Sequence, residues 1–215
     1  MKSVKKAAML ALVLTGTAFS AFAQKKISEG TITYTISANG QSQDAVCSFK
    51  GDSAAVAVQN GPASIKTLMN DKSDYFAILV DVPVAQKKFA AVATPADQEK
   101  FKEMEPEITA TATTETQTIA GYKCTKMNAK DAKSGKTFDV WVTKDIEVPV
   151  NSVNKYVSKL GGVPVKFSTV QMGQVANVEM KSLKEEKIKP NTFAVPSDFE
   201  KITFEQLMSM GGGQR

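Results

Sequence analysis

The chain has 215 residues, with 27 lysines and arginines, 22 acidic residues, two cysteines and no histidine. Without histidine it has no Ser-His-Asp triad, no Cys-His pair and no imidazole metal ligand, and two cysteines cannot build a four-thiolate metal site. A hydrophobic content of 42% and a charged content of 23% are typical of a globular protein rather than of a coiled coil or a disordered tail.

Residues 1–23 predict an export signal peptide. A basic start with three lysines precedes an apolar run, and Ala21-Phe22-Ala23 is the small-x-small pattern that signal peptidase cleaves. The run is too short to span a bilayer core of about 30 Å, so cleavage before Gln24 is favoured over a retained anchor. We therefore expect an exported protein, periplasmic or secreted, with no transmembrane anchor after cleavage.

The net charge changes when the signal is removed. Residues 1–23 carry three lysines and no acid, so the net charge falls from +5 to +2. Such a small excess does not provide the many phosphate contacts of a nucleic-acid-binding protein, and we expect no nucleic-acid partner. Nothing in the sequence indicates an oligomeric state.

The chain after residue 23 begins with a predicted meander of strands. Gly30–Ser37 alternates apolar residues with threonines, the pattern of a strand with one buried face. Asn39-Gly40 is a strong signal for a two-residue hairpin. Further strands are predicted at about 42–50, 54–59, 65–70 and 75–80, separated by turns rich in glycine, proline, asparagine and aspartate.

A helix is predicted after the meander, with Thr94 as its N-cap, Pro95 at its first position and Pro106 as its latest end. Strands then resume at about 108–119, 122–129 and 137–144.

The last third of the chain mixes the two patterns. From Asn151 to Leu160 apolar residues recur at helical spacing, which predicts a second helix. A hairpin follows over residues 165–183, then a short edge segment at Phe193–Pro196 and a final short helix that begins near Phe204.

These elements predict one domain over residues 24–215, mainly β with inserted helices. Ten or eleven antiparallel strands in one sheet must curl or split, because long open edges invite aggregation. We expect an incomplete, half-open β-barrel that covers short helices, with a two-sheet sandwich as the alternative.

The two cysteines, Cys47 and Cys124, lie in alternating segments of an exported chain. A disulfide between the two predicted strands would suit that environment. Two buried, unpaired thiols are the alternative.

Five motifs stand out along the chain: Glu29–Tyr34, Thr118–Cys124, Val140–Thr143, Gly161–Pro164 and Phe193–Pro196. Together they resemble a family of secreted bacterial domains of unknown function, similar in fold to the periplasmic lipoprotein carriers and their outer-membrane receptors (LolA/LolB-like). The resemblance covers nearly all of the chain after the signal and rests on turn and strand motifs. It implies an incomplete barrel of about eleven strands over helices with an apolar interior, which holds lipoprotein acyl chains in the carriers.

Large apolar side chains of the predicted strands and second helix are the candidate ligand-binding residues. If they leave the barrel partly empty, they line a site for an apolar ligand such as a lipid or the acyl chain of an acylated protein. The alternative is a cell-envelope interaction protein with a filled core and no ligand. The candidates are Ile32, Tyr34, Phe49, Phe76, Ile78, Trp141, Tyr156, Phe167 and Met172.

We expect no enzymatic activity, no catalytic residues, no cofactor and no metal site. The SxxK spacing of Ser-Lys enzymes is identified at Ser3–Lys6, inside the signal segment. Acidic residues near Pro106 and in the turn at 71–74 are interpreted as solvated, and no calcium-loop or phosphate-binding motif is present.

Overall fold

The computed structural model describes residues 24–171 and 174–211. The expected signal segment, residues 1–23, and the candidate residue Met172 lie outside the described residues. Neither helix within the described ranges has the length and apolar character needed to cross a membrane.

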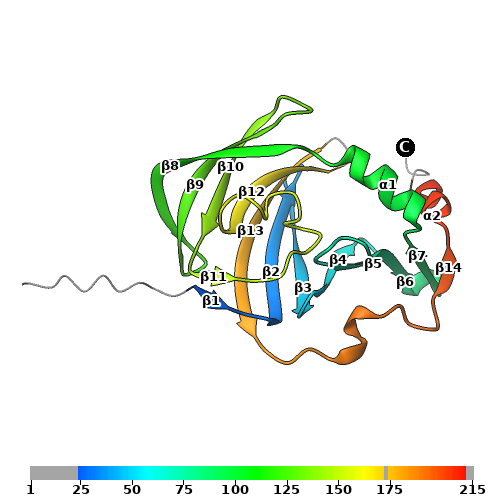
Figure 1. The fold of residues 1–215 in the computed structure, drawn as a ribbon. Coiled ribbons are helices and arrows are strands. Elements are labelled where there is room, and N and C mark those ends of the chain that lie inside the picture. Colours follow the sequence, from blue (N-terminus) through cyan, green and yellow to red (C-terminus); the bar gives the residue numbers. More distant parts are fainter. Residues whose placement is uncertain (1–23, 172–173, 212–215) are drawn as a thin grey trace, which may run out of the picture.

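The described elements are mostly strands, with two α-helices and two short 3₁₀ helices (Figure 1). In chain order they are β1 (Lys25–Lys26), β2 (Glu29–Ala38), β3 (Gln41–Lys50), β4 (Ser53–Asn60), β5 (Ala63–Asn70), β6 (Phe76–Val82), η1 (Pro83–Ala85), β7 (Lys87–Val92), α1 (Pro95–Met104), β8 (Ile108–Ile119), β9 (Tyr122–Asp131), β10 (Thr137–Thr143), β11 (Ile146–Glu147), β12 (Val163–Gln171), β13 (Gln174–Glu185), η2 (Pro190–Phe193), β14 (Glu200–Ile202) and α2 (Phe204–Gly211).

Twelve of the described strands form one curved sheet in the order β14-β7-β6-β5-β4-β3-β2-β13-β12-β10-β9-β8. Neighbouring strands are antiparallel except β14 and β7, and the outermost strands β14 and β8 do not pair with each other. The sheet is therefore a half-open barrel with short helices beside it (Figure 1), and the predicted fold class is confirmed over the two-sheet sandwich.

The predicted hairpin between β2 and β3 is present, with Asn39 and Gly40 in its turn. Both residues have positive φ angles, 52° and 75°, which the mirror-image turns of tight hairpins require and which asparagine and glycine adopt most readily. The hairpin register then places Ile32 opposite Cys47 and Tyr34 opposite Ala45, on one face of the sheet.

The inner face of the sheet carries the main hydrophobic core. A row of directly opposed residues crosses this face from β2 to β7, and the members of the row in β2, β3 and β4 are buried. Strands β10, β12 and β13 add Val140, Phe167 and Met180 to the same core. The row from β2 to β7 is Ile32, Cys47, Val56, Thr67, Ile78 and Ala91.

The outer face of β4 to β7 carries a second buried cluster, which residues 186–202 cover. We call residues 186–202 the outer strap. Its apolar side chains Phe193, Val195 and Phe199 pack against the cluster, and its strand β14 pairs in parallel with β7. The cluster consists of Ala55, Leu68, Ala77, Leu79 and Ala90.

The outer strap corrects the expectation for Phe193–Pro196. These residues do not form an edge strand, because Pro190 begins a 3₁₀ turn and Phe193 and Val195 pack on the outer face of the sheet. The edge strand is β14 instead. Its partner β7 was also not predicted, because no strand was expected between residue 80 and the helix that begins at Thr94.

Residues 151–160, which we call the inner loop, correct the prediction of a second helix. They form consecutive turns, with Val157 N–H donating to Asn154 O and Leu160 N–H to Val157 O. The side-chain oxygen of Asn151 accepts from the N–H groups of Val153 and Asn154, so side-chain bonds compete with a regular helical ladder.

Of the two alternatives for the cysteines, the structure has two buried free thiols rather than a disulfide. Cys47 lies in β3 and Cys124 in β9, with four strands of the sheet between them. Burial raises the pKa of the Cys47 thiol to about 12, so this thiol is not a reactive thiolate at neutral pH.

Candidate functional site

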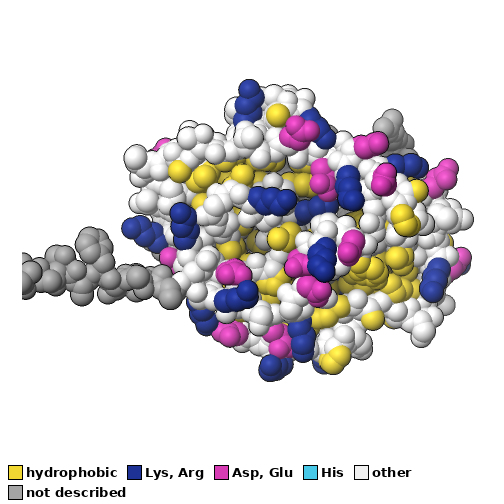
Figure 2. All heavy atoms as spheres, viewed as in Figure 1, with side chains coloured by type: hydrophobic (Ala, Val, Ile, Leu, Met, Phe, Trp, Pro, Cys, Tyr) yellow, Lys and Arg dark blue, Asp and Glu magenta, His cyan; other side chains and the backbone are white. Residues whose placement is uncertain are grey.

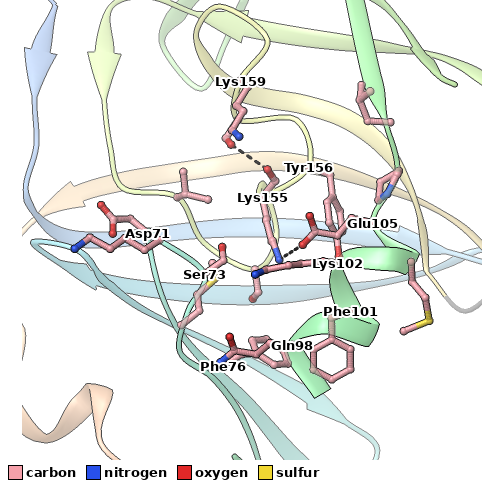
Figure 3. Close-up of a pocket in the computed structure, with 18 of the residues that line it drawn as sticks. Asp71, Ser73, Phe76, Gln98, Phe101, Lys102, Glu105, Lys155, Tyr156 and Lys159 are labelled. Atoms are coloured by element: carbon pink, nitrogen blue, oxygen red, sulfur yellow. Dashed lines mark hydrogen bonds and ion pairs between the residues drawn. The ribbon is translucent and has the colours of Figure 1, made fainter. Parts of the chain in front are cut away.

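A cavity of about 640 Å³ opens at one end of the half-barrel, between the turn that joins β5 to β6, helix α1 and the inner loop (Figure 3). Both apolar and polar side chains line it. The apolar ones come from the ends of β5 and β6 beside this turn, from α1, from the inner loop and the residue before it, and from the start of β8. They include Met69, Phe76, Phe101, Ile108, Val150 and Leu160.

An aromatic cluster builds one wall of this cavity. Phe76 of β6 and Phe101 of α1 meet edge to face with ring centroids 5.9 Å apart, and Phe204 of α2 lies 5.9 Å from Phe76 and 5.2 Å from Phe101. Such pairs add about 0.5–1.5 kcal/mol each beyond their burial. The cluster therefore fixes both helices against the start of β6.

Helix α1 is held at both ends by polar contacts. At its start, Thr94 Oγ1 accepts from Asp97 N–H and the Asp97 carboxylate accepts from Thr94 N–H, a capping box. At its end, Lys133 Nζ donates to the carbonyl oxygens of Glu103 (2.9 Å) and Glu105 (2.6 Å). These contacts set the position of Phe101 and of the residues that follow the helix.

The inner loop is held over the sheet by both apolar and polar contacts, since Val157 and Leu160 are buried in the main core and hydrogen bonds add to this packing. Asn151 Nδ2 donates to Tyr34 Oη at 3.2 Å in a fully buried position, and the hydroxyls of Ser152 and Thr67 lie 2.7 Å apart. Burial raises the pKa of Tyr34 well above its usual value, so the phenol stays protonated and can act as donor or acceptor.

The inner loop also contributes a charged contact across the cavity. The ammonium group of Lys155 forms an ion pair with Glu105 beyond the end of α1 (Figure 3). It lies 5.5 Å from the centre of the Tyr156 ring. Burial, and then the Glu105 charge, raise the pKa of the Tyr156 phenol.

Three further lysines line the cavity without an acidic partner within 4.0 Å among the described residues: Lys72, Lys102 and Lys159. Figure 2 shows Lys and Arg side chains across a hollow in this face, with hydrophobic side chains on both sides of it. The cavity therefore joins apolar walls to a basic opening.

A second cavity, of about 250 Å³, lies on the other side of the inner loop. Val150, Ser158 and Lys159 line both cavities, so the loop forms a partition between them. The rest of the second cavity is lined by Asn154 of the loop, by Gln24, by the end of β11 with Val148, and by Gly161–Pro164 at the start of β12.

The structure places the predicted lining residues in three different settings. Phe76 and Tyr156 line the larger cavity. Ile32, Tyr34, Phe49 and Phe167 do not, because they fill the main core.

The remaining two described candidates, Ile78 and Trp141, also lie outside the cavity lining. Ile78 lies on the inner face opposite Thr67 and Ala91. Trp141 pairs with Lys126 and Lys166, which puts it on the opposite face of β10 from Val140.

Several cavity residues were not predicted from the sequence. Phe101 and Lys102 lie in α1, and Glu105 comes directly after it. The start of this helix was predicted, but the direction in which its side chains point was not. Lys155 and Lys159 lie in the loop that was expected to be a helix. The sequence feature that corresponds to the polar side of the cavity is the set of lysines at positions 72, 102, 155 and 159.

One motif in the cavity has catalytic spacing, since Ser152 and Lys155 also form an SxxK pattern. The Ser152 hydroxyl, however, is hydrogen-bonded to Thr67, and the Lys155 ammonium is paired with Glu105. A nucleophile needs an adjacent base, and these contacts direct the two groups to other partners. Among residues 24–171 and 174–211, no group of three or more Cys, Asp or Glu side chains is placed to hold a metal ion.

Comparison with known proteins identifies a family and several loosely similar structures. Residues 28–148 match the family model described as "Domain of unknown function (DUF4412)". The search of curated proteins finds no match.

Among solved structures, PNGF-II is 16% identical with a TM-score of 0.49; the match covers 85% of this chain but only 32% of PNGF-II. A DUF1329 family protein from Desulfovibrio piger is 10% identical (81% of this chain, 92% of that chain, TM-score 0.36), and LprF from Mycobacterium bovis is 12% identical (76% and 90%, TM-score 0.34). Since these TM-scores are all below 0.5, function has to be argued from this chain's own residues.

Proposed function

Because the chain belongs to the DUF4412 family, whose description names no activity, we propose a function from the site itself: an exported, non-enzymatic protein that binds an apolar ligand, such as a lipid or the acyl chain of an acylated protein. The observation that carries this proposal is the cavity of about 640 Å³ with apolar walls at the open end of the half-barrel.

The size and lining of the cavity support a small apolar ligand. Small-molecule sites are typically about 300–1,000 Å³, with apolar walls and a few polar groups. Met69, Phe76, Phe101 and Leu160 offer such walls, and each methylene that a ligand buries against them contributes about 0.8 kcal/mol.

A binding role without chemistry is supported by the contacts of the reactive groups. The hydroxyl and ammonium groups of the SxxK spacing in the cavity are engaged with Thr67 and Glu105. The buried thiol of Cys47 has a raised pKa and lies in the core rather than in the cavity.

Export is supported by the sequence of residues 1–23, with its basic start, apolar run and Ala21-Phe22-Ala23. A periplasmic or secreted location would bring the cavity to lipids and acylated proteins of the cell envelope.

An envelope interaction protein without a ligand is the second candidate. It is favoured by the filled centre of the molecule, where Tyr34, Phe49 and Asn151 leave less than 1% of their surface exposed. This candidate predicts that the larger cavity contains only solvent in protein taken from cells.

Native mass spectrometry of protein purified from cell envelopes, together with titration of a fluorescent fatty acid, tests the proposal. We expect a co-purified apolar molecule and saturable uptake. Replacing Ile108, which lines the cavity, by tryptophan should place a bulkier side chain against the ligand and weaken uptake roughly tenfold.

Thr111→Trp is the matched control, because Thr111 lies in the same strand but is exposed on the opposite face of β8. Its uptake should equal that of the wild type. Ligand-free protein that takes up no fatty acid would rule out the proposed function and favour the second candidate.

A further inference from the structure

The charges that line the larger cavity are unequal. Four lysines and two acids face it, which leaves an excess of two positive charges. The ion pair of Lys155 with Glu105 neutralises one lysine and one acid. The excess therefore belongs to Lys72, Lys102 and Lys159, with Asp71 as the one opposing charge.

These three lysines come from three separate elements around the cavity. Lys72 is in the turn between β5 and β6, Lys102 is in the last turn of α1, and Lys159 is near the end of the inner loop. Figure 3 shows Lys102 and Lys159 on opposite sides of the Lys155–Glu105 pair. The arrangement places positive charge around an opening whose walls are apolar.

We infer that the cavity selects amphiphiles whose head group is anionic: the apolar part lies against Phe76, Phe101 and Leu160, and Lys72, Lys102 and Lys159 hold the head group. This inference rests on the proposed function and adds the chemical class of the ligand. A carboxylate and a phosphate head group share the required chemistry.

The physical reason is that a neutral amphiphile interacts favourably with the apolar walls of the cavity but not with its lysines. Charge-assisted hydrogen bonds from lysine to a carboxylate or phosphate are roughly twice as strong as neutral ones, and an adjacent apolar wall reduces competition by water. A neutral head group gains neither the charge interaction nor the additional strength of these bonds. Asp71 acts in the opposite direction, since its carboxylate repels an anion.

Isothermal titration calorimetry of the whole protein with dodecanoate, dodecyl phosphate and dodecanol tests this inference. The three probes share one alkyl chain and differ in the head group. We expect both anions to bind roughly tenfold more tightly than the alcohol at low salt. In the triple variant Lys72→Gln, Lys102→Gln, Lys159→Gln that preference should disappear, while dodecanol binds as before.

The matched control removes three lysines that do not line the cavity: Lys87→Gln, Lys100→Gln, Lys144→Gln. It changes the net charge by the same amount and should keep the preference for anions. Asp71→Asn should shift the result in the other direction, with tighter binding of both anions and no change for the alcohol.

The outcomes separate the two claims. Equal binding of all three probes would overturn the head-group inference and leave the proposed function standing. Binding of none of them would overturn both. A preference for the phosphate over the carboxylate, or the reverse, would support the inference and identify which head group the site prefers.

Discussion

Strands β5 and β6 are covered on both faces, and the two coverings are built differently. On the outer face, the outer strap packs Phe193, Val195 and Phe199 onto a buried apolar cluster. On the inner face, the inner loop buries Val157 and Leu160 in the main core, the hydroxyls of Ser152 and Thr67 tie it to β5, and a cavity remains beside it.

This difference indicates different roles for the coverings of the two faces. An apolar covering is stabilised over its whole area, because every buried side chain contributes. The inner loop also buries Val157 and Leu160, and its hydrogen bonds contribute about 1 kcal/mol each, but part of it lines a cavity instead of packed side chains. We therefore interpret the outer strap as a structural element and the inner loop as the element that a ligand meets.

The largest effect is expected when the outer covering is broken. Leu68→Ala removes a side chain that is 1% exposed at the centre of the outer cluster, and it should lower the free energy of unfolding by about 2–5 kcal/mol. Urea denaturation measures this change. Fatty-acid affinity should stay at the wild-type value where the variant is folded.

Val84→Ala is the control for this substitution, because Val84 is 80% exposed in η1 and its loss should cost less than about 0.5 kcal/mol. If Leu68→Ala weakens ligand binding as strongly as it weakens folding, the two coverings are not independent.

A smaller effect is expected when the inner covering is loosened. Asn151→Ala removes the donor to Tyr34 Oη and the acceptor of two backbone N–H groups, and it should cost about 1–3 kcal/mol. Unlike Leu68→Ala, it should also change fatty-acid affinity, because the inner loop lines the cavity.

The partner variant Tyr34→Phe sharpens this test. In a double-mutant cycle the two substitutions should be non-additive, since both remove the same hydrogen bond. Additive costs would contradict the view that Tyr34 and Asn151 act together to hold the inner loop.

The sheet and its two coverings also differ in how well the sequence predicts them. The alternation in β2, the turn at Asn39-Gly40 and the cap at Thr94 predict local structure, and the half-open barrel follows from the number of strands. These signals are local, because each depends on residues a few positions apart.

The coverings depend on contacts between distant parts of the chain, and there the sequence misleads. Helical spacing at 151–160 reflects which residues face the core, while the side chain of Asn151 favours turns instead. The candidates Ile32, Tyr34, Phe49 and Phe167 lie in a filled core, which was the alternative to a ligand-binding lining, because periodicity does not distinguish a core residue from a cavity residue.

A third and smaller effect is expected at α1, which forms part of the wall of the larger cavity. Thr94→Ala removes the N-cap of α1, where Thr94 Oγ1 accepts from Asp97 N–H at 3.2 Å, and should cost about 1 kcal/mol. Thr94→Ser keeps the hydroxyl and should restore most of the stability. Thermal denaturation followed by circular dichroism compares the three proteins, and equal loss in both variants would show that the cap is not the cause.

The smallest effect at neutral pH concerns Glu29, the anchor of the outer strap. The wild type is expected to lose this stabilisation as acid protonates the Glu29 carboxylate. The Ile188 N–H, then Lys187 and Lys50, hold the pKa of Glu29 at about 2, below its ordinary value of 4.5. A carboxyl group whose pKa is lowered by folding stabilises the protein fully above its unfolded-state pKa, and this contribution is lost as the pH falls toward the folded-state value. The urea midpoint of the wild type should therefore fall between about pH 4.5 and pH 2.

Glu29→Gln should start lower at pH 7 and fall less over that window, while Glu99→Gln, an exposed change on α1, should follow the wild type. Parallel acid curves for the wild type and Glu29→Gln would mean that this carboxylate does not anchor the outer strap.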